Sequence, residues 1–381
     1  MKIIHTSDWH LGKQLHEHSL IEDQKYILHQ LLDFIQNNPH DALIIAGDIY
    51  DRSIPSADSV GLLSWFLSTL RSFSTIAVFI IPGNHDSASR LSFCSEIFAL
   101  SNIYFRFDPH LVDEPVSIVC GDEHADFYLL PFLDPLAFDF PGEGIEKCMA
   151  THETVVATAM DKITKKLIPE HINILTAHLF ARGGLTSDSE RRFVGSAGDV
   201  DFRIIDHFDY VALGHLHHPQ EINKRIYYSG SLLKYSFSES SDKKKIISID
   251  INKKDLSIEY FEFTPLRDMK KVKGTLDGLL HDVLYDEYKN CYLDVELEDG
   301  SIVSNPVSIL RDSFPFIMTV RQKALFERNK DVVINFERCN KGIENDFIDF
   351  HEFIYSDPPN QDEMNLFIQT LKKSGIEHET S

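Results

Sequence analysis

Short apolar runs alternate with stretches of helical periodicity through the first half of the chain. The runs are rich in aliphatic and β-branched residues, as buried strands are, and lie at Lys2–Thr6, Ala42–Ala46, Ile76–Ile81, Asn173–Ala177 and Tyr210–Leu213. Between them, apolar side chains recur on one helical face in Ile21–Ile35, Val60–Leu70 and Val155–Ile168. This alternation predicts βαβ units and a layered α/β core.

The pattern changes after residue 208, where strands follow one another without long helices between them. These predicted strands cover Arg225–Tyr228, Lys245–Ile251 and Ser257–Phe263. We expect them to form a second, mixed or antiparallel sheet that closes onto the first. The predicted fold is therefore an α/β sandwich of two sheets flanked by helices, with four layers in the order α-β-β-α.

A break at Thr264-Pro265-Leu266 separates residues 1–265 from a small α/β unit that we predict for residues 266–336. One helix is expected over Thr275–Tyr288, with strands at Tyr292–Leu297, Ile317–Arg321 and Val332–Phe336. Residues 337–381 are acidic and carry two amphipathic stretches, separated by Asp357-Pro358-Pro359-Asn360. Their apolar positions are Phe347, Phe350 and Ile354, followed by Met364, Phe367, Ile368 and Leu371.

The composition is that of an ordinary globular protein, with 43% hydrophobic and 25% charged residues among 381. The apolar start of the chain is too short for a signal peptide, and no stretch reaches the length of a membrane span. Five scattered cysteines without a CxxC pair predict reduced thiols, neither a disulfide framework nor a zinc cage. We therefore expect a cytoplasmic protein that does not bind membranes.

The net charge of −22 opposes any role in binding nucleic acid. Proteins that hold DNA freely usually carry a basic excess, because neutralising phosphates supplies most of their non-specific affinity. This chain cannot attract a polyanion by its overall charge. Bound divalent metals, a local basic loop or a basic partner would have to supply that attraction.

Polar clusters stand where the predicted strands end, and together they offer only oxygen and nitrogen donors. Such donors exclude a thiolate-preferring site and suit two divalent ions such as manganese, iron or zinc. Two carboxylates facing two divalent ions leave a net positive site, which would attract a phosphate. The candidate ligands are Asp8, His10, Asp48, Asn84, His178, His215 and His217.

The spacing of these residues indicates strand ends rather than a helix. Asp8 and His10 are two residues apart, as are His215 and His217. Residues at i and i+2 share a face of a strand but face apart on a helix, so a zincin-type helical site is excluded. Glycines 47, 83 and 214 each precede a candidate ligand, where the backbone must turn tightly.

The motifs resemble, in order, the five motifs of the calcineurin-like metallophosphoesterase superfamily. They are Asp8-x-His10, Gly47-Asp48-x-x-Asp51, Gly83-Asn84-His85-Asp86, His178 and Gly214-His215-x-His217. More narrowly, residues 5–12, 81–87 and 212–217 are similar to the SbcD-like family of bacterial nuclease subunits. That family resemblance implies a metal-dependent DNA nuclease, acting as a double-strand exonuclease and a single-strand or hairpin endonuclease.

The resemblance also assigns roles to the site residues. One ion would be held by Asp8, His10, Asp48 and His217, and the other by Asp48, Asn84, His178 and His215, so that Asp48 bridges. Mn²⁺ is the expected ion, with Mg²⁺, Fe²⁺ and Zn²⁺ as alternatives. His85 would contact the scissile phosphate and assist the leaving oxygen, as a nearby imidazole can near neutral pH. Asp86 is expected to fix the tautomer of His85, and Asp51 to be structural rather than ligating.

Partners follow from the same resemblance. Residues 1–265 would form the nuclease domain, residues 266–336 a capping domain that recognises DNA, and residues 337–381 helices that dock an SbcC-like coiled-coil ATPase. A homodimer, and a heterotetramer with the ATPase, is implied. So is a role at the nucleoid in DNA repair, recombination and replication of palindromic DNA.

Three arginines after the His178 strand, Arg182, Arg191 and Arg192, could clamp a DNA backbone near the metals or form a solvated charged turn. Two other functions stay open. A phosphatase or cyclic-nucleotide phosphodiesterase of the same superfamily would share the metal chemistry without needing the appended unit. A catalytically dead scaffold would share only the fold, although such proteins tend to lose ligands and this chain keeps all seven.

Overall fold

The computed structural model describes residues 1–16, 18–92, 95–135, 151–190, 198–323, 347–348, 350–352, 355 and 357–374. The chain divides into two compact units, Met1–Gln322 and Lys323–Ser381. The first unit holds every candidate ligand. Among the described residues, none of the helices is both long and apolar enough to cross a membrane.

The first unit contains a six-stranded sheet whose centre is parallel. Its strand order is β16 (Leu256–Glu262), β15 (Lys245–Ile251), β1 (Lys2–Thr6), β4 (Ala42–Ala46), β5 (Ala77–Ile81) and β6 (Ile103–Phe105). Strands β1, β4, β5 and β6 run parallel, whereas β15 pairs antiparallel with both β1 and β16.

In a second six-stranded sheet the four inner strands run parallel, and an antiparallel strand lies at each edge. Its order is β13 (Gln220–Asn223), β14 (Ile226–Tyr228), β12 (Tyr210–Gly214), β9 (Ile172–His178), β8 (Glu123–Leu130) and β7 (Val116–Cys120). The parallel strands β8, β9 and β12 end at the same edge, because Leu130 pairs with Ala177 and Gly214 with His178.

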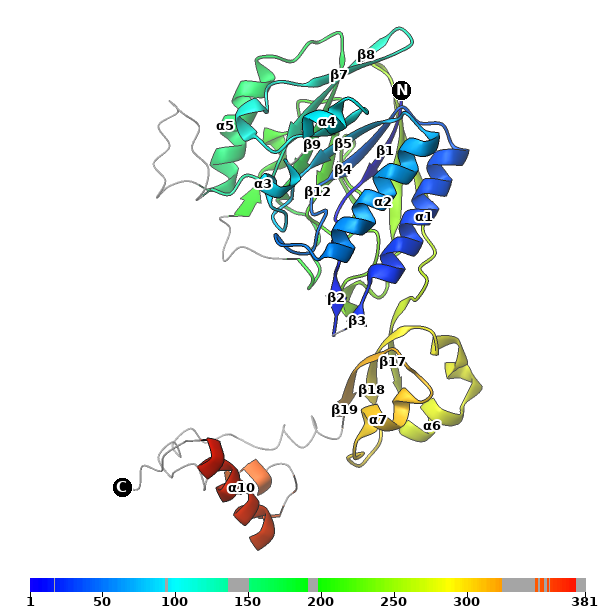
Figure 1. Ribbon diagram of the computed structural model, residues 1–381, viewed down its shortest axis with the longest axis vertical. Helices are drawn as coiled ribbons and strands as arrows, with labels where there is room; N and C mark the ends of the chain where they lie inside the picture. The colour runs from blue at the N-terminus through cyan, green and yellow to red at the C-terminus, as the bar shows by residue number, and fades with distance from the viewer. Residues whose placement is uncertain are drawn as a thin grey trace, which may run out of the picture. The chain divides into compact units, whose positions relative to one another are not determined.

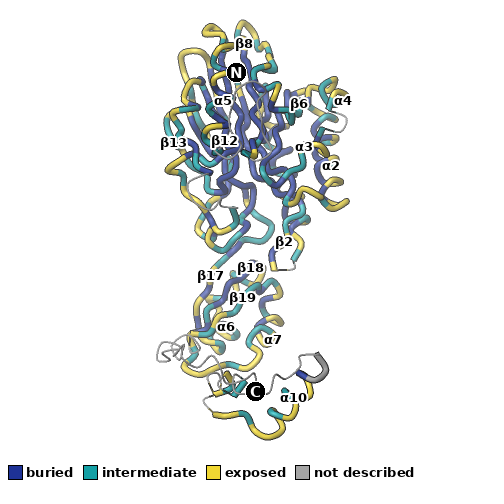
Figure 2. Tube along the Cα trace, turned by 90° about the vertical axis from the view of Figure 1, so that its left-hand side faces the viewer, coloured by how far each residue is buried: buried dark blue, intermediate teal, exposed yellow. Residues whose placement is uncertain are grey.

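Helices cover the outer faces of both sheets, as Figure 1 shows. Successive side chains of a strand point to opposite faces of the sheet, so their packing shows which layer lies on each face. In β1, Ile4 packs in a core with α1 (Ile21–Asn37) and α2 (Ala57–Phe73), while Ile3 packs between the sheets. In β8, Phe127 packs between the sheets, while Tyr128 packs in a core with α5 (His152–Thr164). The predicted α/β sandwich is confirmed, and the two sheets are its most deeply buried part (Figure 2).

Side-chain caps define where the longer helices begin. Helix α2 starts after Ser56, whose hydroxyl accepts the backbone N–H of Ser59. Helix α5 starts with a capping box in which Thr151 and Thr154 each bond the other's backbone N–H. Such caps satisfy N–H groups that have no partner within the helix.

The prediction that the strands after residue 208 form the second sheet is wrong in part. Strands β15 and β16 join the first sheet beside β1, whereas β9 and β12 belong to the second sheet with β14. Hydrophobic patterning shows that a strand is buried on both faces, but it does not show which neighbour completes its hydrogen bonds. The strands at β7 and β8 and the short strand β6 were not predicted.

A small parallel sheet follows within the first unit, in the order β17 (Met269–Gly274), β18 (Tyr292–Leu297) and β19 (Ile317–Gln322). It has its own apolar cluster with α6 (Leu276–His281) and α7 (Pro306–Arg311). The single helix predicted over Thr275–Tyr288 is wrong. Asp282 is extended after α6, and its carboxylate caps a separate 3-10 helix, Val283–Tyr288.

The second unit contains α10 (Gln361–Ser374) and a short helical stretch before it. The rings of Phe347 and Phe367 stack at 3.9 Å, and Leu371 is buried. The two amphipathic stretches therefore contact each other. Ile354 and the strand expected at Val332–Phe336 lie outside the described residues, and the boundaries at residues 265 and 336 stay predictions.

Several short elements complete the described chain. They are β2 (Gln14–Leu15), β3 (His18–Ser19), α3 (Ala88–Leu91), α4 (Ser95–Ala99), β10 (Phe180–Ala181), β11 (Asp199–Val200), and 3-10 helices at Pro109–Leu111, Phe202–Ile204 and Phe237–Glu239.

Candidate metal centre

The candidate ligands all lie at the carboxyl ends of parallel strands, where the two sheets meet. Asp8 and His10 follow β1, Asp48 follows β4 and Asn84 follows β5 in the first sheet. His178 ends β9, and His215 and His217 follow β12, in the second. Asn84 is half-buried and the other six are buried. Carboxyl ends of parallel strands are the usual place for such sites.

The seven side chains form two groups of donors. We call Asp8, His10 and His217 the His217 group; their ligand atoms lie within 4.8 Å of one another. We call Asn84, His178 and His215 the His178 group, in which the Asn84 Oδ1 lies 3.0 Å from His178 Nε2 and 2.9 Å from His215 Nδ1. Asp48 serves both, because its Oδ2 lies 3.6 Å from His10 Nε2 and 3.5 Å from His178 Nε2.

The hydrogen bonds around the histidines direct lone pairs toward one another. His178 Nδ1 lies 2.9 Å from the carbonyl of Ala46, which can only accept, so this nitrogen carries the hydrogen. The other nitrogen then presents a lone pair to the Asn84 Oδ1. A second close contact of candidate ligand atoms joins the two Nε2 atoms of His10 and His217, 3.0 Å apart. Lone pairs this close repel each other unless a cation or a proton lies between them.

This donor set fits a pair of divalent ions. Atoms about 3 Å apart have the spacing of neighbouring ligands around an ion with bonds of ~2.1 Å. Burial alone would lower the pKa of His178, but the charge of Asp48 raises it to about 9. Burial also raises the pKa of Asp8 to about 6. Metal binding would replace such protons, as ligation requires deprotonated side chains.

Strained backbone holds four of the ligands in place. Asp8, His10, Asp48 and His215 have positive φ angles of 53°, 44°, 49° and 105°. Such conformations cost about 1–3 kcal/mol each in non-glycine residues and cluster at functional sites. Close approach also requires glycine nearby: a Cβ on Gly83 would lie 2.1 Å from the Asp48 Oδ1, and one on Gly214 would lie 1.8 Å from the carbonyl oxygen of Ala46.

His85 stands beside the His217 group without belonging to it. Its backbone N–H donates to the Asp48 Oδ1 at 2.9 Å, and its ring meets that of His10 edge-on at 4.8 Å. Its Nδ1 lies 2.8 Å from the backbone carbonyl of Asp51, so Nδ1 carries the hydrogen. The atom that gains or gives up a proton is therefore Nε2.

Comparisons with known proteins agree with this geometry. The family model for calcineurin-like phosphoesterase matches residues 1–219. The chain belongs to that family. The SbcD subunit of the nuclease SbcCD from Staphylococcus saprophyticus is 36% identical over 319 residues, covering 83% of each chain. The protein of the same name from Staphylococcus epidermidis is 35% identical over 323 residues, covering 84% of this chain and 85% of its own.

These two relatives place the phosphoesterase in the SbcD family of nuclease subunits. Among solved structures, TT1561 of Thermus thermophilus is 12% identical, with a TM-score of 0.39 over 68% of this chain and 97% of its own. That likeness is too distant to carry any conclusion about function.

Asp86 of this phosphoesterase ties two ligand loops together. One carboxylate oxygen accepts the N–H groups of Gly83 and Ile49, and the other accepts that of Tyr50. Burial, followed by the charge of Asp48, raises the pKa of Asp86 to about 7. Asp86 is expected to fix the tautomer of His85, and this role stays a prediction; the Nδ1 of His85 lies against the main-chain carbonyl of Asp51.

Asp51 also contributes its side chain at the edge of the centre. Its carboxylate pairs with Lys13 at 2.8 Å and lies 3.8 Å from His10 Nδ1. Asp51, His10 and His85 form a third cluster whose ligand atoms lie within 4.8 Å of one another. The expectation that Asp51 is structural stays a prediction.

Sequence reasoning missed the residues that hold the His217 group from behind. Gln24 on α1 donates to the carbonyls of Trp9 and His10, at 3.2 and 2.7 Å. The Tyr235 ring lies edge-on to His10 and His217, with centroids 5.5 and 5.7 Å away. Ser189, Glu190, Glu239 and Lys244 also contact His217.

Of the three predicted DNA-contacting arginines, Arg182 lies within the described residues. Arg182 is half exposed and pairs with Glu153 at 2.7 Å and with Asp201 at 3.8 Å. These carboxylates offset much of its charge. Arg191 and Arg192 lie outside the described residues.

Proposed function

We propose that this phosphoesterase is the nuclease subunit of an SbcCD-type complex and hydrolyses DNA phosphodiesters with two divalent ions, Mn²⁺ being preferred. The observation that carries the proposal is the pair of buried donor groups that share Asp48, in a chain 36% identical to a protein named as that subunit. Both exonuclease cleavage of duplex DNA and endonuclease cleavage of single strands or hairpins are expected.

The residues divide the work of hydrolysis. The His217 group and Asp48 would hold one ion, and the His178 group and Asp48 the other. When bound, the two ions supply Lewis-acid stabilisation of phosphate oxygens and an activated water. Asp48 keeps the two groups at a common centre and accepts the N–H of His85. His85, with Nδ1 fixed on the Asp51 carbonyl, offers Nε2 as the proton donor to the leaving oxygen.

DNA binding requires help from outside this acidic chain. The net charge of −22 repels a polyanion, so we assign part of the attraction to an SbcC-like ATPase partner. Residues 266–336 would cap the site and contact DNA, and residues 337–381 would dock the ATPase. The exposed side chains of Phe350, Tyr355 and Leu366 suit such docking. A homodimer, a heterotetramer with the ATPase, and a nucleoid role in DNA repair, recombination and replication complete the proposal.

A substrate panel tests this function. The full chain is incubated with linear duplex, hairpin and single-stranded DNA, and separately with p-nitrophenyl phosphate and its bis ester, with and without Mn²⁺, ATP and the partner. We expect Mn²⁺-dependent cleavage of DNA. Turnover of the small esters without DNA cleavage would instead indicate a phosphatase or small-molecule phosphodiesterase, and inactivity on every substrate would indicate a scaffold.

A substitution at His85 tests the assignment of the proton donor. His85→Gln should lower DNA cleavage about 10²–10⁴-fold, the usual contribution of a general acid, while Mn²⁺ binding is retained. His218→Gln is the matched control, because His218 follows a ligand directly but is partly exposed and pairs with Asp242. Equal activity of the His85→Gln variant and the wild type would remove His85 from the mechanism.

A further inference from the structure

A buried ion pair lies directly behind His217. Lys244 Nζ lies 2.6 Å from the Glu239 Oε2, and the two side chains are 5% and 1% exposed. The same ammonium donates to the backbone carbonyl of His217 at 2.8 Å. Neither residue belongs to a motif of the donor set, and both reach the centre through His217.

The second oxygen of Glu239 reaches the ring of His217 through a hydroxyl. Ser189 Oγ donates to the Glu239 Oε1 at 2.5 Å, which leaves its oxygen to accept from His217 Nδ1 at 2.7 Å. The Nδ1 of His217 therefore carries the hydrogen, and its Nε2 keeps a lone pair that faces His10. Glu190 accepts the backbone N–H of His217 at 2.7 Å, so the residue is held at its N–H, its carbonyl and its ring.

Such a buried ion pair is not explained by stability alone. Removing two charges from water costs several kcal/mol per ion, and well-packed apolar residues of similar volume are often at least as stable. The adjacent cavity, of about 180 Å³, is lined in part by apolar side chains, including Leu232 and Leu233. Apolar residues in place of the ion pair could pack against these side chains. The polar arrangement around His217 therefore calls for a role in orientation.

We propose that Glu239, Ser189 and Lys244 are positioning residues that fix the tautomer and direction of the His217 ring and so set the affinity of the His217 group for its divalent ion. The His178 group is independent of them, because His178 is oriented by the main-chain carbonyl of Ala46. The inference deepens the proposed function by assigning further residues to one half of the metal centre. It requires the centre to bind metal but does not require DNA to be the substrate.

The test is a calorimetric titration of the metal-free full chain with Mn²⁺. The wild type should bind two ions. In Glu239→Gln, Ser189→Ala and Lys244→Met, one binding step should weaken about 10–100-fold, as when other residues that orient metal ligands are replaced, and the other should stay unchanged. Ser189→Thr, which keeps the hydroxyl, should restore most of the lost affinity.

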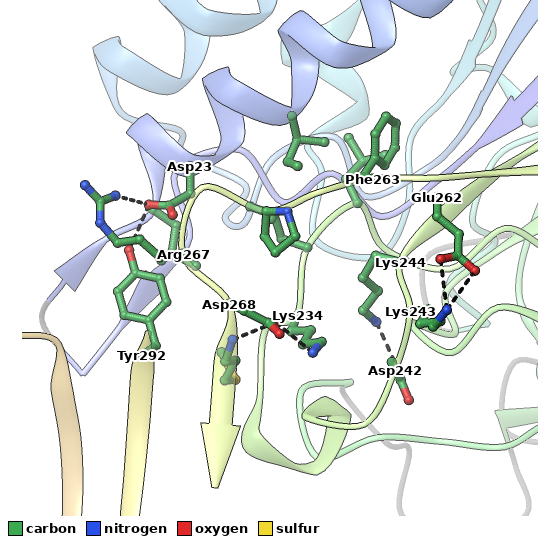
Figure 3. Close-up of a pocket in the computed structure, with 16 residues that line it drawn as sticks. Asp23, Lys234, Asp242, Lys243, Lys244, Glu262, Phe263, Arg267, Asp268 and Tyr292 are labelled. Carbon is green, nitrogen blue, oxygen red and sulfur yellow. Dashed lines mark hydrogen bonds and ion pairs between the residues drawn. The ribbon is translucent and has the colours of Figure 1, made fainter. Parts of the chain in front are cut away.

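Lys243 provides a matched control. It is the neighbour of Lys244 on the same cavity but pairs at the surface with the exposed Glu262, 3.1 Å away (Figure 3). Lys243→Met should leave both Mn²⁺ binding steps as in the wild type. A positioning role also predicts that excess Mn²⁺ restores kcat in the Ser189→Ala variant with an unchanged KM for substrate.

The outcomes separate this inference from the proposed function. Wild-type affinity in both steps for Glu239→Gln and Ser189→Ala would overturn the positioning role. Weakening of both steps together would also overturn it, because a general loss of structure would then explain the result. If Glu239→Gln fails to fold, Ser189→Ala decides, since it removes one hydroxyl from a half-buried side chain. A wild-type chain that binds no Mn²⁺ would refute the proposed function itself.

Discussion

The two halves of the centre are supported in different ways. His178 lies at the end of the buried strand β9, and a main-chain carbonyl orients its ring. His217 lies in a loop after β12, and side chains from two distant segments, 187–190 and 239–244, hold its ring and its backbone carbonyl. A ligand held by the main chain resists single substitutions, whereas one held by side chains can be tuned by them. Four experiments sharpen or break this contrast.

Removing the ligand common to both halves should have the largest effect. Asp48→Asn keeps the shape and an acceptor for the His85 N–H but removes the shared negative charge. We expect both Mn²⁺ sites to be lost and DNA cleavage to fall by more than the ~10–100-fold typical of residues that only orient ligands. Elemental analysis gives the Mn²⁺ content, and Asp33→Asn, on the exposed side of α1, is the control. Two retained ions would show that Asp48 does not join the halves.

The stabilisation of the folded chain by Mn²⁺ should contain a separate contribution from each half of the centre. An ion present at a hundred times its Kd stabilises the folded chain by about 2.7 kcal/mol per site, so Mn²⁺ should raise the Tm and EDTA should lower it. At the same Mn²⁺ concentration, a 10–100-fold weaker His217 group would contribute only ~0.4–1.4 kcal/mol. Thermal unfolding of the wild type and Glu239→Gln measures the difference. Equal Mn²⁺-dependent shifts would contradict separate halves.

Arg267 tests whether the His217 group responds to any disturbance near Lys244. Both residues line the same cavity, where Arg267 binds the buried Asp23 at 2.9 Å and Tyr292 donates to the same carboxylate oxygen (Figure 3). Arg267→Ala should cost about 1.5–3 kcal/mol of stability, the range for hydrogen bonds to charged groups, yet leave Mn²⁺ affinity unchanged. Chemical denaturation and calorimetry measure the two quantities. A weakened Mn²⁺ site would mean that the cavity as a whole, rather than the Lys244–Glu239 pair, supports His217.

The smallest effect is expected on the His178 side. The Phe132 ring lies edge-on to His178 at 6.2 Å, and such contacts contribute about 0.5–1.5 kcal/mol. Phe132→Leu should lower stability by that amount and change Mn²⁺ affinity by less than ~3-fold, because the Ala46 carbonyl still orients the ring. Calorimetry is again the measurement. A loss as large as that in Ser189→Ala would erase the contrast between the halves.

Sequence patterns predict the positions of single strands better than the pairing of those strands within the sheets. The bounds predicted for Lys2–Thr6, Ala42–Ala46, Lys245–Ile251 and Tyr292–Leu297 coincide with β1, β4, β15 and β18. A strand that is largely buried can be predicted from its continuous run of apolar residues. Which strand pairs with which depends on contacts between distant segments, so the sequence does not predict the place of β15 in the first sheet.

The same limit applies to the metal centre. The donor side chains stand at strand ends within recognisable motifs, and the structure brings the seven predicted residues together. Glu239 and Lys244 carry no such signal, because a glutamate among serines and a lysine within a run of three normally indicate a solvated surface. The Nδ1 of His85 contacts a main-chain carbonyl, and no residue type identifies such a contact. Whether each donor binds an ion stays a prediction.

The left-handed backbone at Asp8, His10, Asp48 and His215 narrows what evolution or an engineer can place there. Aspartate, asparagine and histidine are the side chains that tolerate this conformation best, and all three can coordinate ions. Exchange within this trio would alter which metal is preferred while sparing the main chain. A valine or isoleucine would remove the ligand atom and also force the loop to rearrange. Such a substitution therefore combines the loss of a ligand with the loss of the loop conformation, whereas a substitution to asparagine would change the ligand and keep the conformation.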